Sequence, residues 1–559
     1  MRTIKLGLGL LAAVLFNTAA SAGTLSGVVN DSAGQPINGA MLRFTNSRNI
    51  SESVFTNAEG GYTLTTMMSG TLNIRLRSPY FHDDHDKVVL ARNANIDKNM
   101  SMTAMTSAVE ISDSLPAAYH FGSLPFEEGD DADFNRRQFQ RDCLSCHQLG
   151  NTFTRVPRQA KDWTGTIGRM HLYMGNFDKA LRDRRSSILE QGFNGKALSV
   201  RPRFPVDAEL QKATIFEYPL LNRGIPQDTI AHPESGLLYS VDQALHHISV
   251  TDPKTGNTTY IAQQGSLADQ YYTGTPAEQT LSEFEPGKLD GPHSLDRGLD
   301  GKYYVTNTGS TSIGVFNPAN NQWQASHRLP VEHSGHYPHS IRVNKAGMVY
   351  FTMAGAEHIG RLNPELGSFD IIALPLVKSG GISAGTQPYG IDISPIDDAL
   401  WYSRLFGDKI GRIDPVTLAV TEHDSPVRGP RRMRFDSNGI LWVAGFSEGK
   451  LARINVSAGF ESSVYAMPEF APGYPPAPYA LAVHPTTQEI WLNETMTDHL
   501  YRFIPSEEHF IAYPMPLSGS YTRDTTFLPD GRVCAANSPI PAPALEGGIL
   551  EIICIDTGT

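Results

Sequence analysis

The chain has 559 residues with an ordinary globular composition, 40% hydrophobic and 19% charged, so it is long enough to build several domains with their own cores. Its formal net charge of -12 argues against a nucleic-acid partner, because phosphate binding requires clustered lysine and arginine. An acidic surface serves solubility, and it can also steer a basic partner protein.

Residues 1–22 predict a secretory signal peptide. A basic start with Arg2 and Lys5 precedes an apolar run over residues 6–16, and Ala20-Ser21-Ala22 forms a small-residue cleavage site. The run is too short to span a bilayer, and no later stretch reaches the roughly 18 apolar residues that a membrane helix needs. We therefore expect a periplasmic or secreted protein without a membrane span.

Residues 23–104 predict a small antiparallel β-sandwich, because short alternating strands are separated by turn clusters. The order G-x-V-x-D-x-x-G-x-P-I-x-G-A, followed by T-N-A-E-G-G-Y-T-L, resembles the carboxypeptidase regulatory-like domain family. That family usually supplies a spacer or adhesion unit, so we expect no chemistry here. The polar run from His82 to Asp86 fits a solvated loop better than a metal site.

The stretch Arg-Asp-Cys-Leu-Ser-Cys-His, residues 141–147, contains C-x-x-C-H, the attachment sequence of a c-type haem. Cys143 and Cys146 would bond covalently to the porphyrin, and His147 would be the proximal iron ligand. A redox C-x-x-C pair or half of a zinc site are the alternatives, but no second cysteine pair lies nearby. Export also suits covalent haem attachment, so we expect one haem c.

Residues 105–212 predict a small helical domain around this motif. Helices are expected over 134–142, 161–173 and 177–191, and the arrangement resembles a small cytochrome c.

The sixth iron ligand is expected from the second of these helices. Met170 and Met174 lie one helical turn apart and can share a face. Met170 is the first choice, because its W-x-x-x-I-x-R-M stretch resembles that of related single-haem domains, and Met174 is the second. His171 or an open site remain as alternatives. Methionine ligation would raise the haem potential and favour electron acceptance.

Residues 213–559 contain seven repeats, which predict a seven-bladed β-propeller. The repeats begin near 228, 293, 339, 389, 431, 479 and 523, and most spacings are about 42 to 50 residues. The longer first unit carries an insertion near 264–288. Strand material at 214–218 is expected to complete the last blade, and a disulfide between Cys534 and Cys554 is expected to fix that closure.

The blade phrase P-H/Y-x-I, followed by L-W-x-x-x and I-G-R-I-D-P, resembles the virginiamycin B lyase (streptogramin lyase) family over about 340 residues. In that family a His on an inner strand and a Glu about 14 residues later take part in a magnesium-assisted elimination. Here His293 and His339 are followed at that distance by Asn307 and Met353. Glu494 stands at the right place in its blade, but its partner there is Tyr479, so the lyase pair is split.

The repeat alignment predicts two rings of residues around the central channel. The position that opens each inner strand holds Asp228, His293, His339, Tyr389, Arg431, Tyr479 and Arg523. About 14 residues later the chain has Asp242, Asn307, Met353, Arg404, Gly445, Glu494 and Asn537. Such a lining suits a small phenolic or anionic organic substrate, with His or Tyr moving a proton. The alternative is a water-filled channel whose polar groups satisfy one another.

The candidate catalytic residues are therefore His293, His339, Tyr389, Arg431, Tyr479, Glu494 and Arg523. A second candidate site is His333, His336 and His339, spaced by three, which could bind copper or zinc with His293 or His232 as the fourth ligand. Pro338 forces an extended approach, so the three imidazoles need not converge.

The sequence thus predicts a periplasmic c-type haem oxidoreductase, a dehydrogenase that oxidises a small substrate in the channel. Electrons would pass through the haem to a soluble cytochrome or the respiratory chain, and a copper or magnesium ion in the propeller is possible. No G-x-G-x-x-G opens a strand-to-helix unit, which argues against a nicotinamide or flavin fold. Two alternatives stay open: a magnesium-dependent lyase of the streptogramin lyase type, and a non-enzymatic electron-transfer protein whose propeller docks a partner.

Overall fold

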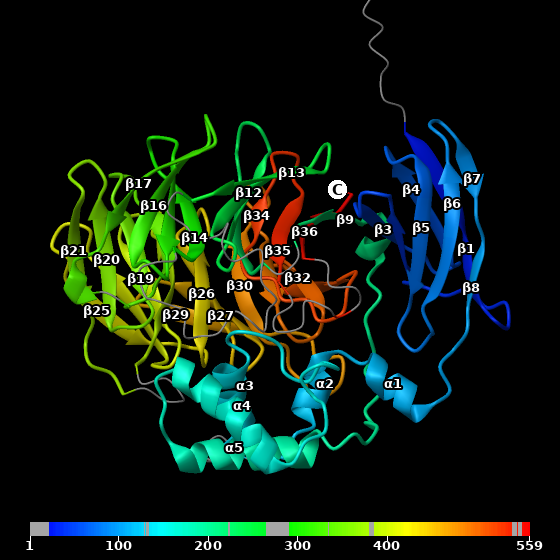
Figure 1. The fold of residues 1–559 in the computed structure, drawn as a ribbon, viewed down its shortest axis with the longest axis horizontal. Coiled ribbons are helices and arrows are strands. Elements are labelled where there is room, and N and C mark those ends of the chain that lie inside the picture. The colour runs from blue at the N-terminus through cyan, green and yellow to red at the C-terminus, as the bar shows by residue number, and fades with distance from the viewer. Residues whose placement is uncertain are drawn as a thin grey trace, which may run out of the picture.

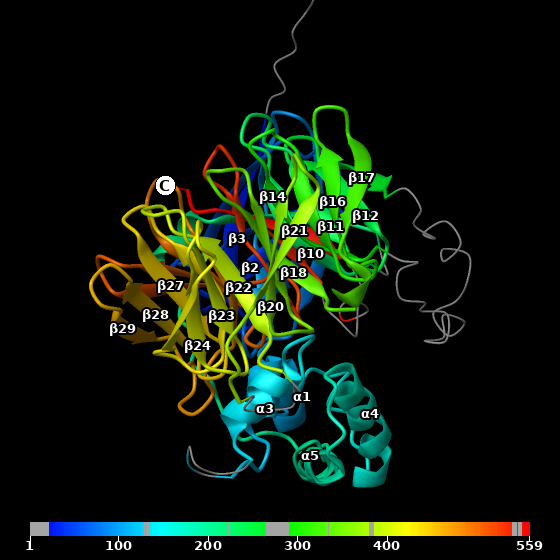
Figure 2. The same cartoon turned by 90° about the vertical axis from the view of Figure 1, so that its left-hand side faces the viewer.

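The computed structural model describes residues 22–558 except 128, 130–133, 222–223, 264–289, 334, 379–384, 539–544 and 546–549. A β-sandwich stands beside a ring of β-sheets, and a group of helices lies against one end of that ring (Figures 1 and 2). The expected signal peptide, except for its last residue, and the expected insertion at 264–288 lie outside the described residues.

Two packed sheets form the sandwich, as the sequence predicted. One contains β1 (Gly23–Asp31), β4 (Gly61–Thr66), β7 (Asn95–Asp97) and β8 (Met100–Met102), and the other contains β2 (Met41–Thr45), β3 (Ser51–Phe55), β5 (Gly70–Arg77) and β6 (Asp84–Leu90). In β5, Leu72, Ile74 and Leu76 alternate with polar residues, so one face of the strand fills the core. The polar run that we expected as a loop instead begins strand β6 at Asp84.

Seven four-stranded antiparallel sheets form the ring. Blades 1 to 3 are β10 (Pro226–Ala231), β11 (Leu238–Asp242), β12 (His247–Asp252), β13 (Asn257–Ala262); β14 (Pro292–Arg297), β15 (Tyr303–Asn307), β16 (Ser312–Asn317), β17 (Gln322–Arg328); and β18 (Pro338–Val343), β19 (Val349–Met353), β20 (His358–Asn363), β21 (Ser368–Ala373). Blades 4 to 6 are β22 (Pro388–Ile393), β23 (Leu400–Arg404), β24 (Lys409–Ile413), β25 (Val420–Asp424); β26 (Pro430–Phe435), β27 (Ile440–Gly445), β28 (Lys450–Asn455), β29 (Glu461–Ala466); and β30 (Pro478–Val483), β31 (Ile490–Glu494), β32 (His499–Ile504), β33 (His509–Pro514). Each expected repeat start lies in an inner strand or just before one.

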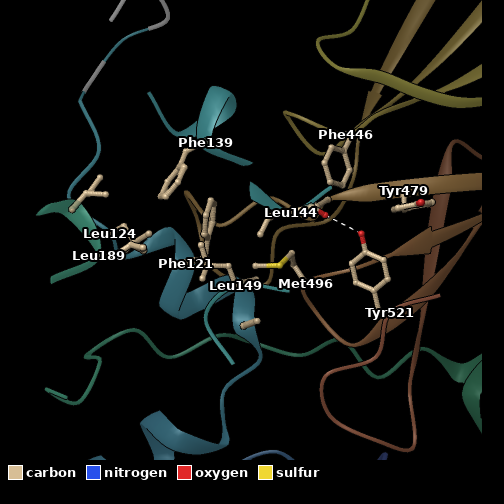
Figure 3. Close-up of a cluster of buried hydrophobic side chains, with 14 of the residues drawn as sticks. Phe121, Leu124, Phe139, Leu144, Leu149, Leu189, Phe446, Tyr479, Met496 and Tyr521 are labelled. Carbon is tan, nitrogen blue, oxygen red and sulfur yellow. Dashed lines mark hydrogen bonds between the residues drawn. The ribbon is translucent and has the colours of Figure 1, made fainter. Parts of the chain in front are cut away.

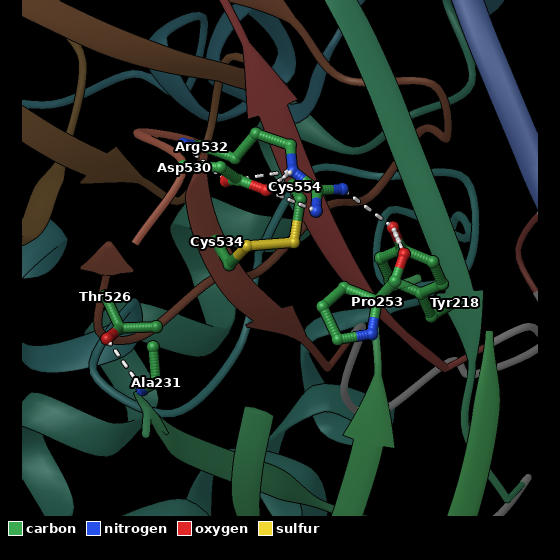
Figure 4. The surroundings of a disulfide bond; sticks show 8 residues. All are labelled: Tyr218, Ala231, Pro253, Thr526, Asp530, Arg532, Cys534 and Cys554. Carbon is green, nitrogen blue, oxygen red and sulfur yellow. Dashed lines mark hydrogen bonds and ion pairs between the residues drawn. A yellow bond between two sulfur atoms is a disulfide. The ribbon is translucent and has the colours of Figure 1, made fainter. Parts of the chain in front are cut away.

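The seventh blade closes the ring with a strand from the other end of the repeat region. It contains β34 (Thr526–Phe527), β35 (Val533–Asn537), β36 (Glu551–Asp556) and β9 (Thr214–Pro219). Cys534 and Cys554 face each other across β35 and β36 and form a disulfide (Figure 4). Both the closure by β9 and the disulfide confirm the sequence predictions.

The sequence did not predict that the sandwich would extend this last blade. β3 pairs with the free edge of β9, so blade 7 and one sandwich sheet form a continuous eight-stranded sheet. Across the junction, the guanidinium of Arg43 pairs with the carboxylate of Glu217 at 2.7 Å, and both side chains are buried. Burial and the neighbouring Glu217 raise the pKa of Glu551 well above its ordinary value. The sandwich is therefore joined to the propeller through backbone pairing and a buried ion pair.

The described residues contain five α-helices, all of which come after the sandwich and before the first blade in sequence. They are α1 (Ala108–Ser114), α2 (Ala117–Gly122), α3 (Arg136–Cys143), α4 (Ala160–Tyr173) and α5 (Lys179–Gly192), and a 3-10 turn at Ala208–Lys212 leads into β9. The three expected helices are α3, α4 and α5, whereas α1 and α2 were missed. Side chains that accept a backbone N–H begin two of them, Asn135 at α3 and Asp178 at α5. Within the described part of the chain, no helix is long and apolar enough to cross a membrane.

We expect the double substitution Cys534→Ser and Cys554→Ser to lower the free energy of unfolding by about 2–4 kcal/mol, because the disulfide closes a short loop in the blade that seals the ring. Urea unfolding, followed by circular dichroism, measures the effect. Reduction of the wild-type protein is the matched control, and an unchanged unfolding midpoint in both cases would contradict this role.

Candidate functional site

The loop that carries Cys143, Cys146 and His147 packs directly on the inner strands of the propeller. Apolar side chains of α2 and α3 share one buried cluster with Phe446, Met496 and Tyr521 of the ring (Figure 3). Three side chains of the ring bind backbone carbonyls of this loop. Tyr521 Oη donates to Leu144 O at 2.9 Å, Arg431 Nη2 to Ser145 O at 2.8 Å, and Arg523 Nη2 to Cys146 O at 3.5 Å.

The three residues of the C-x-x-C-H motif have the chemistry of a covalent attachment site. Neither Cys143 nor Cys146 forms a disulfide, and burial raises the pKa of the Cys143 thiol to about 12. The Nδ1 atom of His147 hydrogen-bonds the Gln148 carbonyl oxygen at 2.7 Å. Because Nδ1 then carries the proton, Nε2 keeps a lone pair, which is the state in which an imidazole binds a metal ion. Burial also lowers the pKa of His147, so the ring stays neutral.

The candidate sixth ligands differ in their surroundings. Met174 and Cys143 both pack against the same buried cluster, and Gln387 Nε2 lies 3.9 Å from the Met174 sulfur. Met170, the first choice from sequence, is not among the described members of that cluster. His171 is hydrogen-bonded by Arg185 Nη1 at 3.2 Å, and burial and Arg185 lower its pKa to about 4. The packing therefore favours Met174.

Below the loop, a tyrosine and arginine cluster lies where the inner strands begin. The hydroxyls of Tyr389 and Tyr479 are 2.7 Å apart, Arg431 Nη2 donates to Tyr389 Oη at 2.6 Å, and Arg523 Nη1 donates to Tyr479 Oη at 3.2 Å. The Arg431 guanidinium lies 3.8 Å from the centroid of the Tyr479 ring, a cation–π contact. Tyr521 completes the cluster but was missed from sequence, because it lies two residues before the position that the repeats aligned.

The two bonded tyrosines differ in acidity. Burial alone would raise the pKa of Tyr479, but the positive charges of Arg431, Arg523 and Arg432 outweigh it and lower that pKa to about 8. Burial raises the pKa of Tyr389 well above its ordinary value. Tyr479 therefore ionises first, and the Tyr389 hydroxyl donates its proton in the hydrogen bond between them.

The arginines of the channel differ in how their charge is balanced. Arg432 pairs with both carboxylate oxygens of Asp228 at 2.8 Å and with Asp524 at 2.9 Å. Among the described residues, neither Arg431 nor Arg523 has a carboxylate partner, and the Nε atom of each is buried without a hydrogen bond. The layer next to the loop therefore carries excess positive charge, which suits an anion or a phenolate.

Two predicted histidines extend this cluster into the ring. The centroids of the His293 and His339 rings are 4.1 Å apart, and His339 lies 4.2 Å from Tyr389. Burial, together with nearby positive charge, lowers the pKa of both imidazoles well below the ordinary value, so both are neutral. The Nδ1 atom of His293 is buried without a hydrogen-bond partner in the structure.

The predicted second ring does not surround the channel. Each described member that these pairings include is the last residue of the second strand of its blade and pairs with the first residue of the inner strand. Several of these side chains interact with a neighbouring loop or with the adjacent blade. The carboxylate of Glu494 accepts hydrogen bonds from Ala477, Met496 and Thr497, so the turn of its own blade already uses both oxygens. Arg404 pairs with Glu357 and Glu422. Glu494 is therefore a loop-stabilising residue in this structure.

The predicted group of His333, His336 and His339 is also not assembled. His339 lies in the channel beside His293, whereas His333 and His336 lie near His358, which the spacing did not indicate. His232, offered as a fourth ligand, instead contacts Ser235 and Glu234.

A cleft of about 630 Å³ opens beside α3, between the loops of blades 4 and 5. Charged residues of both signs line it, including Arg137, Asp408, Arg428 and Glu448, but none of the predicted channel residues does. The cleft is therefore separate from the channel residues, over which the loop with Cys143 packs.

Two regions of the chain match models of known families. The virginiamycin B lyase family matches residues 279–473, which include blades 2 to 5, and the carboxypeptidase regulatory-like domain matches residues 24–103. No curated protein matches the chain.

Solved structures similar to this one are 20% identical or less. A streptogramin B lyase structure is 20% identical, with a TM-score of 0.48, and the match covers 62% of this chain and 97% of that one. Inactive virginiamycin B lyase from Staphylococcus aureus with quinupristin is 20% identical over 61% and 99%, also with a TM-score of 0.48. Hydrazine synthase from Kuenenia stuttgartiensis is 15% identical over 57% and 94%, with a TM-score of 0.44. The two family matches place a carboxypeptidase regulatory-like domain ahead of a virginiamycin B lyase-like propeller.

Proposed function

We propose that the protein is a periplasmic c-type haem oxidoreductase that oxidises a small phenolic or anionic substrate at the channel mouth and passes the electrons to an external acceptor. One observation carries the proposal. Arg431 and Arg523 bind carbonyls inside the C-x-x-C-H loop and contact Tyr479 with the same guanidinium groups. The attachment loop and the tyrosine and arginine cluster therefore form a single site.

The residues of the loop fit a covalent haem. Two thiols are free of disulfides, His147 keeps Nε2 available, and Met174 packs against the same buried cluster as Cys143. Haem c bound there would supply one-electron acceptance. On this basis Met174 replaces Met170 as the proposed sixth ligand.

The channel residues supply binding and proton transfer. Arg431 and Arg523 hold the negative charge of a phenolate or carboxylate, since no described carboxylate neutralises them. Tyr479, with a pKa of about 8, is close to the operating pH and accepts a proton from the substrate. Neutral His339 and His293 continue the line of titratable groups into the ring.

The contacts do not favour the magnesium lyase alternative. Local backbone and hydroxyl groups already hydrogen-bond the Glu494 carboxylate. In the two blades whose inner strands carry His293 and His339, the residue at the equivalent position of the second strand is Asn307 or Met353 instead of a glutamate. The covered mouth does favour a second candidate, a non-enzymatic electron-transfer protein. In that case a partner would meet the charged cleft beside α3.

The absorption spectrum of the exported, purified protein separates these candidates. Under anaerobic conditions, phenols, alcohols and carboxylates are added one at a time, and a reduced haem spectrum with one class supports the enzyme. The variant Arg523→Gln should slow that reduction, whereas Arg412→Gln, at an ion pair outside the channel, should not. Reduction by a partner protein alone supports the second candidate, and the absence of a Soret band contradicts both.

We expect Tyr479 to titrate near pH 8, because positive charge from three arginines stabilises its phenolate. The difference in phenolate absorbance between wild type and Tyr479→Phe measures this pKa, and Arg523→Gln should raise it. Since the folded pKa lies below the ordinary value of about 10, ionisation stabilises the fold fully above that value, and this stability is lost as the pH falls through about 8. A wild-type titration that begins only near pH 10 would refute the assignment.

The variants Met174→Ala and Met170→Ala form a matched pair for the sixth ligand. We expect Met174→Ala to lose the methionine-to-iron charge-transfer band and to lower the reduction potential on the order of 0.1 V, because methionine ligation raises the potential. Met170→Ala should keep both properties. The reverse pattern would restore Met170 as the ligand.

A further inference from the structure

Three histidines of blade 3 form a compact group outside the channel. His333 ends a 3-10 turn (Val331–His333), His336 lies in the loop before β18, and His358 begins β20. Their ring centroids are 5.4 Å apart for His333 and His336, 5.9 Å for His333 and His358, and 6.0 Å for His336 and His358. Two segments that are separate in sequence thus bring three imidazoles together.

Backbone hydrogen bonds hold these two segments in place. Gly355 N donates to the His336 carbonyl at 3.0 Å, and Ala354 N donates to the Tyr337 carbonyl at 3.0 Å. These bonds tie the loop before β18 to the hairpin between β19 and β20. Arg431, near the start of an inner strand, hydrogen-bonds Ser145 in the loop after α3, so the inner strands begin at the face of the ring that carries the helices. The three histidines lie near the start of β18, an inner strand, and therefore on that same face.

Each imidazole has a buried nitrogen that nothing satisfies. The Nδ1 atoms of His333, His336 and His358 are all inaccessible to solvent and have no hydrogen-bond partner in the structure. A buried polar atom normally has a hydrogen-bond partner or a ligand, and three unpartnered imidazole nitrogens at one place are consistent with a ligand there.

The spacing of the rings fits one metal ion. A tetrahedral ion with metal–nitrogen bonds of about 2.0–2.1 Å holds imidazole centroids about 5 Å apart. In the ring orientations of the structure, no three His, Cys, Asp or Glu side chains of the described residues form a closed metal site. Closing this group therefore requires the rings to turn about χ2, a broad torsion for histidine, together with a contraction of less than about 1 Å.

We propose that His333, His336 and His358 bind one zinc or copper ion, with solvent in the fourth position. Imidazole nitrogens favour zinc and copper, whereas magnesium and calcium prefer oxygen ligands. Two acidic residues are adjacent to these histidines in sequence. Glu357 is already engaged by Arg404 and by Thr386, and Glu332 is exposed. The site is separate from the channel and does not depend on the proposed oxidoreductase activity.

Metal retention by the full-length, exported protein tests this site. Protein treated with a chelator is dialysed against zinc or copper, and bound metal is counted by mass spectrometry, with iron counted separately. We expect wild type to keep one zinc or copper ion, and His336→Ala and His358→Ala to bind it at least tenfold more weakly. The control His423→Ala removes an exposed histidine of the same propeller and should keep the ion.

Nitrogen hyperfine coupling in the spectrum of bound copper gives a second, independent measurement. Three coordinated imidazoles in wild type, and fewer in His336→Gln with unchanged circular dichroism, support the site. Equal metal content in wild type, His336→Ala and His358→Ala, or no bound zinc or copper in wild type, overturns the proposal.

Discussion

Two buried arginines hold the helical part of the molecule on the propeller. Arg431 and Arg523 are removed from water, and no described carboxylate balances them. Burying an unpaired charge costs several kcal/mol, so its partners must offset that cost. Here the partners are tyrosine faces, a phenol that ionises readily, and carbonyls of the loop that contains Cys146. The same interactions therefore fix the loop over the channel and make the mouth attractive to an anion.

A second junction joins the N-terminal sandwich to the propeller. β9 completes the last blade on one edge and pairs with β3 of the sandwich on the other. Edge strands expose unpaired N–H and C=O groups, and this pairing removes one exposed edge from each domain. The ion pair between Arg43 and Glu217 is buried there, so losing one partner would leave an isolated charge in a low-dielectric region. The sandwich thus pairs directly with β9, the strand that closes the ring.

Local sequence patterns predicted the strands and most of the helices, but they did not predict the contacts between segments that are distant in sequence. The repeat spacing predicted the blades, and helical periodicity predicted α3 to α5, because both depend on near neighbours in the chain. The role of Glu494 was predicted wrongly. A residue about 14 positions after the start of an inner strand lies at the end of the second strand, and there the Glu494 carboxylate hydrogen-bonds a loop. The equal spacing in sequence suggested that His339 lies beside His333 and His336. In the structure, the β19–β20 hairpin places His358 beside them instead.

The layers of the channel favour chemistry at the helix-bearing end. Further along the inner strands, Arg432 and Arg434 pair with Asp228 and Asp524, so that region is balanced and needs no ligand. Next to the loop, positive charge exceeds negative charge, and the arginines there lower the pKa of Tyr479 to about 8 despite its burial. His339 and His293 continue this cluster into the ring, away from the C-x-x-C-H loop, and burial keeps both imidazoles neutral. Under the proposed function, the proton of a bound phenol or acid would therefore pass to Tyr479, whose pKa is lowered, and not to the two histidines.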